Sequence, residues 1–148
     1  MYFKVLVPLD GSREAEKVFA FLQGDVSPDG EIILLQVTPP TKLEELGSHP
    51  MLDNELDQME ANERLGAIRY LHHVAGQYGN DSDQWRCEAI VSMSVAERIV
   101  DIAGREEVDL IALYIDDLKL PDGLVKEGVT WEVERMASTE VRVFGHKE

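Results

Sequence analysis

The 148-residue chain contains a single cysteine, Cys87, so it cannot form a disulfide bond within itself. This composition suits a reducing compartment. No apolar run approaches the ~20 residues that a membrane-spanning helix needs, and the amino-terminal residues do not have the pattern of a secretion signal. We therefore expect a cytoplasmic protein.

Basic residues are scarce relative to acidic ones. Lys and Arg number 14 and Asp and Glu number 29, which gives a formal charge of −15. A surface with this acid excess repels nucleic-acid phosphates and anionic lipid headgroups, so we expect neither nucleic acid nor membrane as a partner. Because 44% of the residues are hydrophobic, the chain can still form a core. Its length fits one domain over residues 1–148.

Short apolar runs alternate with longer amphipathic segments along the chain. The expected strands cover residues 3–9, 31–37, 85–91, 110–114 and 141–144. In residues 3–9 and 31–37, apolar and polar side chains do not alternate. This pattern is typical of strands covered on both faces. Expected helices separate most of these strands. The alternation predicts an α/β fold in which a parallel sheet lies between two layers of helices.

Two serines are placed to cap expected helices. Ser12 precedes a helical stripe of apolar residues (Ala15, Val18, Phe19 and Leu22) and is a suitable N-cap. Ser94 is followed three residues later by Glu97, which is the spacing of a capping box.

Two further local features can be predicted. A long helix is expected over about residues 52–77, with an apolar stripe that passes through Leu65 and Ile68. Residues 28–30, with the sequence Pro-Asp-Gly, are expected to form a turn before the second strand.

The end of the first expected strand is a candidate ligand site, because ligands of open parallel sheets bind at the carboxyl ends of the strands. Here Pro8, Leu9 and Asp10 are followed by Gly11 and Ser12. A carboxylate in this place can accept a hydrogen bond from a ribose hydroxyl, and the start of a helix can hold a phosphate. The same residues also suit a tight turn that caps a helix, so both interpretations stay open.

No motif in the sequence indicates catalysis or a metal site. The adjacent His72 and His73 would point ~100° apart on a helix, which makes a poor pair of metal ligands. Asp116, Asp117 and Asp122 lack the spacing of a calcium loop. The chain has no GxxxxGK[ST] phosphate loop and no recognisable Ser-His-Asp or Cys-His arrangement. We expect no catalytic residues and no metal.

Several segments, in order, resemble the universal stress protein family. VLVPLDGSREAEKV resembles its first strand and helix, SVAERIVDIAGREEVDLIAL its third helix and fourth strand, and GVTWEVERMASTEVRVF its last helix and strand. The similarity extends from Phe3 to Phe144. It implies a five-stranded sheet of order 3-2-1-4-5, as in adenine nucleotide alpha hydrolase-like folds, and a homodimer that is often formed by the last strands.

Some members of this family bind ATP through a loop of the form Gly, two residues, Gly, nine residues, Gly and then Ser or Thr. The matching positions in this chain hold Tyr114, Asp117, Glu127 and Gly128. Glycines let backbone N–H groups approach phosphate oxygens, whereas two carboxylates in their place repel them. The resemblance therefore predicts that ATP binding in the family manner is lost, although a magnesium ion could bridge carboxylates and phosphates.

The positions that match the family's adenine and ribose contacts are Pro8, Leu9, Asp10 and Val37. These four residues also have a structural explanation, because the fold needs them to form the turn and the sheet whether or not a ligand binds. Three functions stay open: a non-enzymatic dimeric stress-response or signalling module that acts on an unidentified protein partner, an adenine-nucleotide sensor or slow ATPase, and a protein that binds another small molecule. We favour the first, with no cofactor, and ATP or AMP is a disfavoured candidate ligand.

The last expected strand, formed by Val141, Arg142, Val143 and Phe144, lies at the edge of the sheet if the resemblance holds. An exposed apolar edge is prone to pair with another strand, and a two-fold partner would cover it. The alternative is a monomer whose edge is protected by charges such as Glu140 and Arg142. We expect the dimer.

Overall fold

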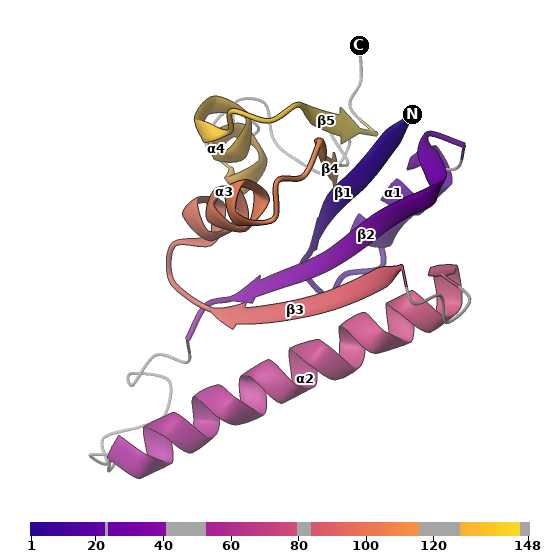
Figure 1. The fold of residues 1–148 in the computed structure, drawn as a ribbon. Helices are drawn as coiled ribbons and strands as arrows, with labels where there is room; N and C mark the ends of the chain where they lie inside the picture. Colours follow the sequence, from indigo (N-terminus) through magenta and orange to yellow (C-terminus); the bar gives the residue numbers. More distant parts are fainter. Residues whose placement is uncertain (23, 41–52, 80–83, 116–127, 146–148) are drawn as a thin grey trace.

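The computed structural model describes residues 1–22, 24–40, 53–79, 84–115 and 128–145. Its five parallel strands form one sheet of order β3-β2-β1-β4-β5, which confirms the expected order (Figure 1). The strands are β1 (Tyr2–Leu9), β2 (Val26–Thr38), β3 (Trp85–Val91), β4 (Leu110–Tyr114) and β5 (Val141–Phe144).

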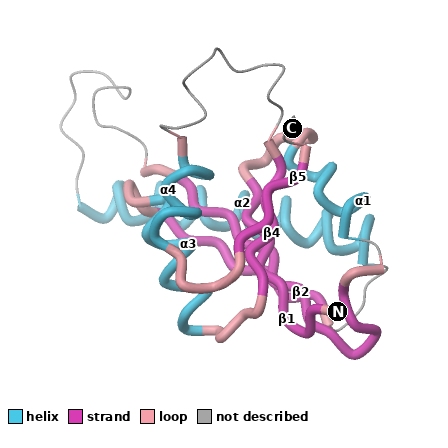
Figure 2. Tube along the Cα trace, turned by 90° about the horizontal axis from the view of Figure 1, so that it is seen from above, coloured by secondary structure: helices cyan, strands magenta, loops and turns pink. Residues whose placement is uncertain are grey.

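Helices cover both faces of the sheet (Figure 2). A 3-10 turn, η1 (Ala15–Lys17), continues into α1 (Val18–Leu22), and the longer helices are α2 (Asp53–Gly79), α3 (Val95–Arg105) and α4 (Val129–Met136). Helices α1 and α2 pack on one face and α3 and α4 on the other. The α/β prediction is therefore confirmed.

The central strand β1 supplies both hydrophobic cores, because successive side chains of a strand point to opposite faces. Val5 and Val7 pack with α1 and α2, whereas Leu6 packs with α3. All three side chains are fully buried. The start of β1 is also tied to β4, since the carboxylate of Asp109 accepts hydrogen bonds from the N–H groups of Phe3 at 2.8 Å and Lys4 at 2.9 Å.

The turn predicted at residues 28–30 is wrong, because these residues lie within β2. Pairing with β1 shifts there: Tyr2 faces Val26, and Lys4 already faces Glu31. The extra residues of β2 bulge out of the ladder. Gly30 allows this close approach, because a Cβ on it would lie 2.9 Å from the carbonyl oxygen of Ser27.

The predicted apolar stripe of α2 is also wrong in part. Leu65 is 46% exposed, whereas Ala67, Leu71 and Val74 are buried against the sheet. Apolar residues occur on more than one side of this helix, so the spacing alone did not identify the buried side. Contact with β2 and β3 decides it.

A network of charged side chains lies near the amino-terminal ends of the strands and the end of α3. Arg86 on β3 contacts Glu31 on β2 and donates a 2.8 Å hydrogen bond to Glu106, which directly follows α3. The bond from Arg86 is the main reason that the pKa of Glu106 falls to about 2. Lys4 on β1 is 3.5 Å from the same carboxylate. The network therefore links three neighbouring strands to α3.

Two findings concern membranes and metals. None of the helices in the described part of the chain is both long enough and apolar enough to cross a membrane. Within those same ranges, no three or more His, Cys, Asp or Glu side chains form a group that could hold a metal ion. His72 and His73 are both exposed on α2.

Leu71→Ala and Leu65→Ala form a matched pair on α2 that tests which side of the helix is buried. Leu71 is 0% exposed, so its truncation should lower the free energy of unfolding by about 2–5 kcal/mol. The exposed Leu65 should change it by less than about 0.5 kcal/mol. Urea denaturation followed by circular dichroism measures both, and equal effects would contradict the placement of α2.

Candidate ligand-binding cleft at the carboxyl ends of the strands

A small cleft opens where β1, β2 and β4 end and where α3 and α4 begin. Its volume is about 180 Å³. The four residues predicted to contact a nucleoside all line it: Pro8, Leu9, Asp10 and Val37. The structure thus brings them together from the ends of two neighbouring strands, and their part in binding stays a prediction.

The loop after β1 is held by the side chains of Asp10 and Ser12. Oδ1 of Asp10 accepts hydrogen bonds from the backbone N–H of Ser12 at 2.9 Å and from its hydroxyl at 2.6 Å. The Ser12 hydroxyl in turn accepts one from the N–H of Ala15 at 3.2 Å, which begins η1. Gly11 has φ +88°, a conformation that glycine adopts readily. The loop therefore has the tight turn that the sequence predicted. The Ser12 hydroxyl accepts a bond from the first N–H of η1, but the N-cap residue of η1 is Glu14 and not the predicted Ser12.

The second carboxylate oxygen of Asp10, Oδ2, takes no part in the bonds that hold the loop. Among the described residues it makes no hydrogen bond, and Asp10 is exposed beside the cleft. One carboxylate oxygen thus fixes the loop while the other can accept a hydrogen bond from a ligand.

Tyr114, which occupies the position of the first family glycine, also lines the cleft. Its ring lies 5.9 Å from Nζ of Lys17 and 6.1 Å from the Phe21 ring. Gly145, at φ +78°, makes room for it, because a Cβ there would lie 2.6 Å from the ring. A packed aromatic side chain therefore stands where a glycine would leave open backbone.

Of the other positions in the altered phosphate loop, Gly128 is the N-cap residue of α4, with φ −86° and ψ 174°. This is extended backbone that any residue can adopt, so glycine is not required there for its conformation. Asp117 and Glu127 lie outside the described residues.

The lining of the cleft is mostly apolar. Val95, Ile99, Leu113 and Val129 contribute aliphatic side chains, and Asp10 is the one charged residue among the described residues that line it. A volume of about 180 Å³ is below the ~300–1,000 Å³ of pockets for drug-sized ligands. The cleft can therefore hold a small uncharged group next to one carboxylate.

Polar residues near the end of β2 and on η1 were given no ligand contact in the sequence interpretation. Oε1 of Gln36 and Oγ1 of Thr38 are buried near the end of β2 and have no hydrogen-bond partner among the described residues. Buried Glu16 on η1 accepts a 2.9 Å hydrogen bond from Tyr70 on α2. Burial and this neighbouring carboxylate raise the pKa of Tyr70 above its ordinary value, so it remains a neutral donor.

The capping box predicted at the start of α3 is wrong. Ser94 is the N-cap residue, but its side chain makes no capping hydrogen bond. Its backbone N–H instead donates to Oγ of Ser92 at 3.1 Å. The chain turns sharply between β3 and α3, and this local contact replaces the reciprocal bonds of the box.

Comparisons with known proteins agree with this architecture. The sequence profile described as the universal stress protein family matches residues 1–144. No curated protein sequence matches the chain.

Three solved structures illustrate the likeness. UspA of Lactobacillus plantarum is 20% identical, with a TM-score of 0.69 and coverage of 96% of this chain and 97% of that one. A universal stress protein in complex with cAMP is 17% identical, with a TM-score of 0.69 and 99% of each chain covered. A family member from Arabidopsis thaliana with AMP bound is 16% identical, with a TM-score of 0.55 and coverage of 95% and 90%.

Ser12→Ala and Ser94→Ala test the two helix starts against each other. The Ser12 hydroxyl makes two hydrogen bonds, so its removal should lower the free energy of unfolding by about 0.5–2 kcal/mol. Ser94 makes no side-chain capping bond, so its removal should change stability by less than about 0.5 kcal/mol. Chemical denaturation of the two variants measures the difference, and a larger loss for Ser94→Ala would contradict the hydrogen bonds described at the two helix starts.

Proposed function

The chain belongs to the universal stress protein family, and on that premise we propose that it is a non-enzymatic, dimeric stress-response or signalling module that does not bind ATP in the family manner. The five-stranded parallel sheet and its helix layers are those of an adenine nucleotide alpha hydrolase-like fold. A fold of this kind supports many functions, so the proposal depends on the strand-end cleft and on the sheet edge.

The charge of the cleft is the main observation behind the proposal that the chain does not bind ATP in the family manner. No Lys or Arg occurs among the described residues that line it, and Asp10 adds a negative charge. A triphosphate would lose hydration there without gaining a counter-charge from these lining residues. The positions of Tyr114, Asp117 and Glu127 in the sequence add to this argument, because each replaces a glycine of the phosphate-binding loop. The described residues therefore do not fit a triphosphate.

An adenine nucleoside or mononucleotide is the second candidate, as part of a sensor or a slow ATPase. Pro8, Leu9, Asp10 and Val37 line one cleft, and Oδ2 of Asp10 can accept a hydrogen bond from a ribose hydroxyl. Two structurally similar family members were solved with cAMP and with AMP. A ligand of this class carries less charge than ATP, which favours it over ATP in an acidic cleft.

The edge strand β5 supports the proposed dimer. The carbonyl groups of Glu140 and Phe144 accept hydrogen bonds from the N–H groups of Ile111, in β4, and of Ile115, which directly follows β4. Backbone groups alternate in direction along a strand, so the N–H and C=O groups of Val141 and Val143 point away from β4. They form an edge that a second copy can pair with.

The charges that could protect this edge in a monomer have partners within the chain. The hydroxyl of Tyr2 donates a hydrogen bond to the carboxylate of Glu140. Arg142 lies 3.7 Å from Asp25 and also lies over the ring of Phe144. These contacts hold both side chains toward their own subunit, which favours pairing over protection.

Isothermal titration with magnesium and ATP, with AMP and with adenosine tests the ligand proposal. We expect any dissociation constant for ATP to lie above about 100 μM, because the cleft offers a carboxylate instead of cations. ATP binding at micromolar affinity or better would contradict the proposal.

Asp10→Asn distinguishes the second candidate in the same experiment. If adenosine or AMP binds through the carboxylate of Asp10, this variant should weaken it by about tenfold, the effect of losing one charge-assisted hydrogen bond. Asp101→Asn, at an exposed position of α3, serves as the control and should leave the affinity unchanged. Equal affinities for the two variants would exclude Asp10 as a ligand contact.

Val143→Pro tests the dimer. Proline removes the outward N–H of β5 without removing a bond to β4, so light scattering at micromolar concentration should shift from the dimer mass to the monomer mass. Val143→Thr keeps the N–H and should stay dimeric. A monomer mass for the unmodified chain would contradict the proposed dimer.

A further inference from the structure

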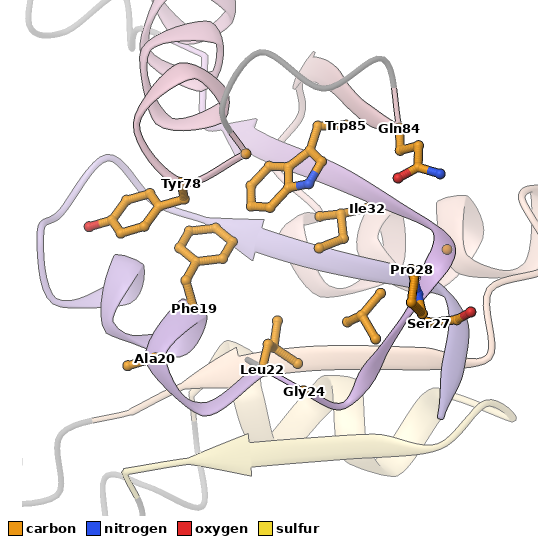
Figure 3. Close-up of a pocket in the computed structure, with 13 residues that line it drawn as sticks. Phe19, Ala20, Leu22, Gly24, Ser27, Pro28, Ile32, Tyr78, Gln84 and Trp85 are labelled. Carbon is orange, nitrogen blue, oxygen red and sulfur yellow. The ribbon is translucent and has the colours of Figure 1, made fainter.

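A second, larger cavity lies at the other end of the sheet, next to the amino-terminal parts of β2 and β3 (Figure 3). Its volume of about 510 Å³ falls within the ~300–1,000 Å³ typical of small-molecule pockets. It shares no lining residue with the strand-end cleft. Along β2, Ile32 at this cavity and Val37 at the cleft are ~17 Å apart in an extended strand. The cavity is therefore a separate place in the molecule.

Three aromatic side chains form one wall of the cavity. Phe19 of α1 stacks on Tyr78 of α2 with ring centroids 4.7 Å apart, and it meets Trp85 of β3 at 5.3 Å in a tilted arrangement. Leu22 and Ile32 lie beside this wall (Figure 3). Phe, Trp and Tyr make up 7% of the chain, so this wall is a local concentration of rings. Such walls bind flat apolar groups by stacking.

The position of the Trp85 ring is fixed by the end of α2. A Cβ on Gly79 would lie 2.6 Å from Cδ2 of Trp85, so only a glycine lets the indole lie flat on the last turn of the helix. The contact between Phe19 and Trp85 restrains the ring from another side. The aromatic wall is therefore in place before any ligand binds, which reduces the entropy lost on binding.

Polar groups lie at the rim, away from the aromatic wall. Ser27 and Gln84 are seen there, on the far side of Ile32 from Phe19 (Figure 3). The Ser27 hydroxyl accepts a hydrogen bond from the N–H of Asp29 at 3.4 Å, which leaves its own proton available to an acceptor on a ligand.

The cavity also restricts the charge of its occupant. None of the described residues that line it carries a charge. A charged group would therefore lose hydration without gaining an opposite charge from these residues, and the chain's net charge of −15 adds a further penalty for anions.

We propose that this cavity binds an uncharged, planar aromatic or heteroaromatic small molecule, which stacks against the exposed Tyr78 and the half-buried Trp85, held in place by the buried Phe19, and hydrogen-bonds at the rim. This site is independent of the function proposed for the cleft, because the two have no residue in common. A ligand here would contact α1, α2, β2 and β3 together.

Indole serves as the probe in a titration of the ¹⁵N-labelled full chain followed by NMR. We expect the amide signals of Gly24, Gly30 and Gly79, which line the cavity, to shift in a saturable way with a dissociation constant below about 1 mM. Signals of Leu9 and Val37 at the cleft should stay in place. Benzoate, which is planar but anionic, should cause no saturable shift, and the non-planar cyclohexanol should bind at least about fivefold more weakly because it cannot stack.

Ala20→Leu and Ala61→Leu provide the matched variants. Ala20 lines the cavity and is exposed on α1, so a larger side chain there narrows the cavity without entering the core. Ala61 is exposed on α2 and does not line the cavity. Ala20→Leu should weaken indole by at least about fivefold and Ala61→Leu should not. The absence of saturable shifts with indole, equal binding of benzoate, or equal affinities for the two variants would overturn the proposal.

Discussion

The parallel pairing of β1 with β2 on one side and β4 on the other is the constraint on which the rest of the molecule depends. Val5 faces both Ile32 of β2 and Leu110 of β4, and the side chains of β1 supply both cores. Because all five strands run in one direction, their carboxyl termini lie together at one end of the sheet and their amino termini at the opposite end. The cleft and the aromatic cavity lie at these two ends as a result.

Much of this fold could be predicted from the sequence because buried parallel strands leave a simple pattern. The expected limits of β3, β4 and β5 match the structure. β4 is an uninterrupted apolar run after Asp109, whereas charged residues interrupt β3 and β5. Two of the errors have a common cause. The bulge at Pro28 and the buried side of α2 each depend on contacts with distant segments, which local spacing does not encode. The missing cap at Ser94 instead follows from the local bond to Ser92.

The candidate cleft could be predicted in outline. Pro8, Leu9, Asp10 and Val37 were placed at strand ends, and parallel topology brings strand ends together. Gln36 was missed because a polar residue near the end of an apolar strand is ordinary in sequence. The aromatic cavity had no signal of this kind, since Phe19, Tyr78 and Trp85 come from three separate elements and each has a sufficient explanation in packing.

The same central position of β1 determines the order in which the sheet can be completed. The strand can pair with β2 as soon as the first 38 residues exist, but its other partner begins at Leu110. During synthesis, one edge of the central strand is thus left open while the intervening helices and β3 are made. Folding of the finished chain must likewise close this long loop before the pairing can form, and contacts of such long range slow folding. The carboxylate of Asp109, which binds the N–H groups of Phe3 and Lys4, marks where that late closure is secured.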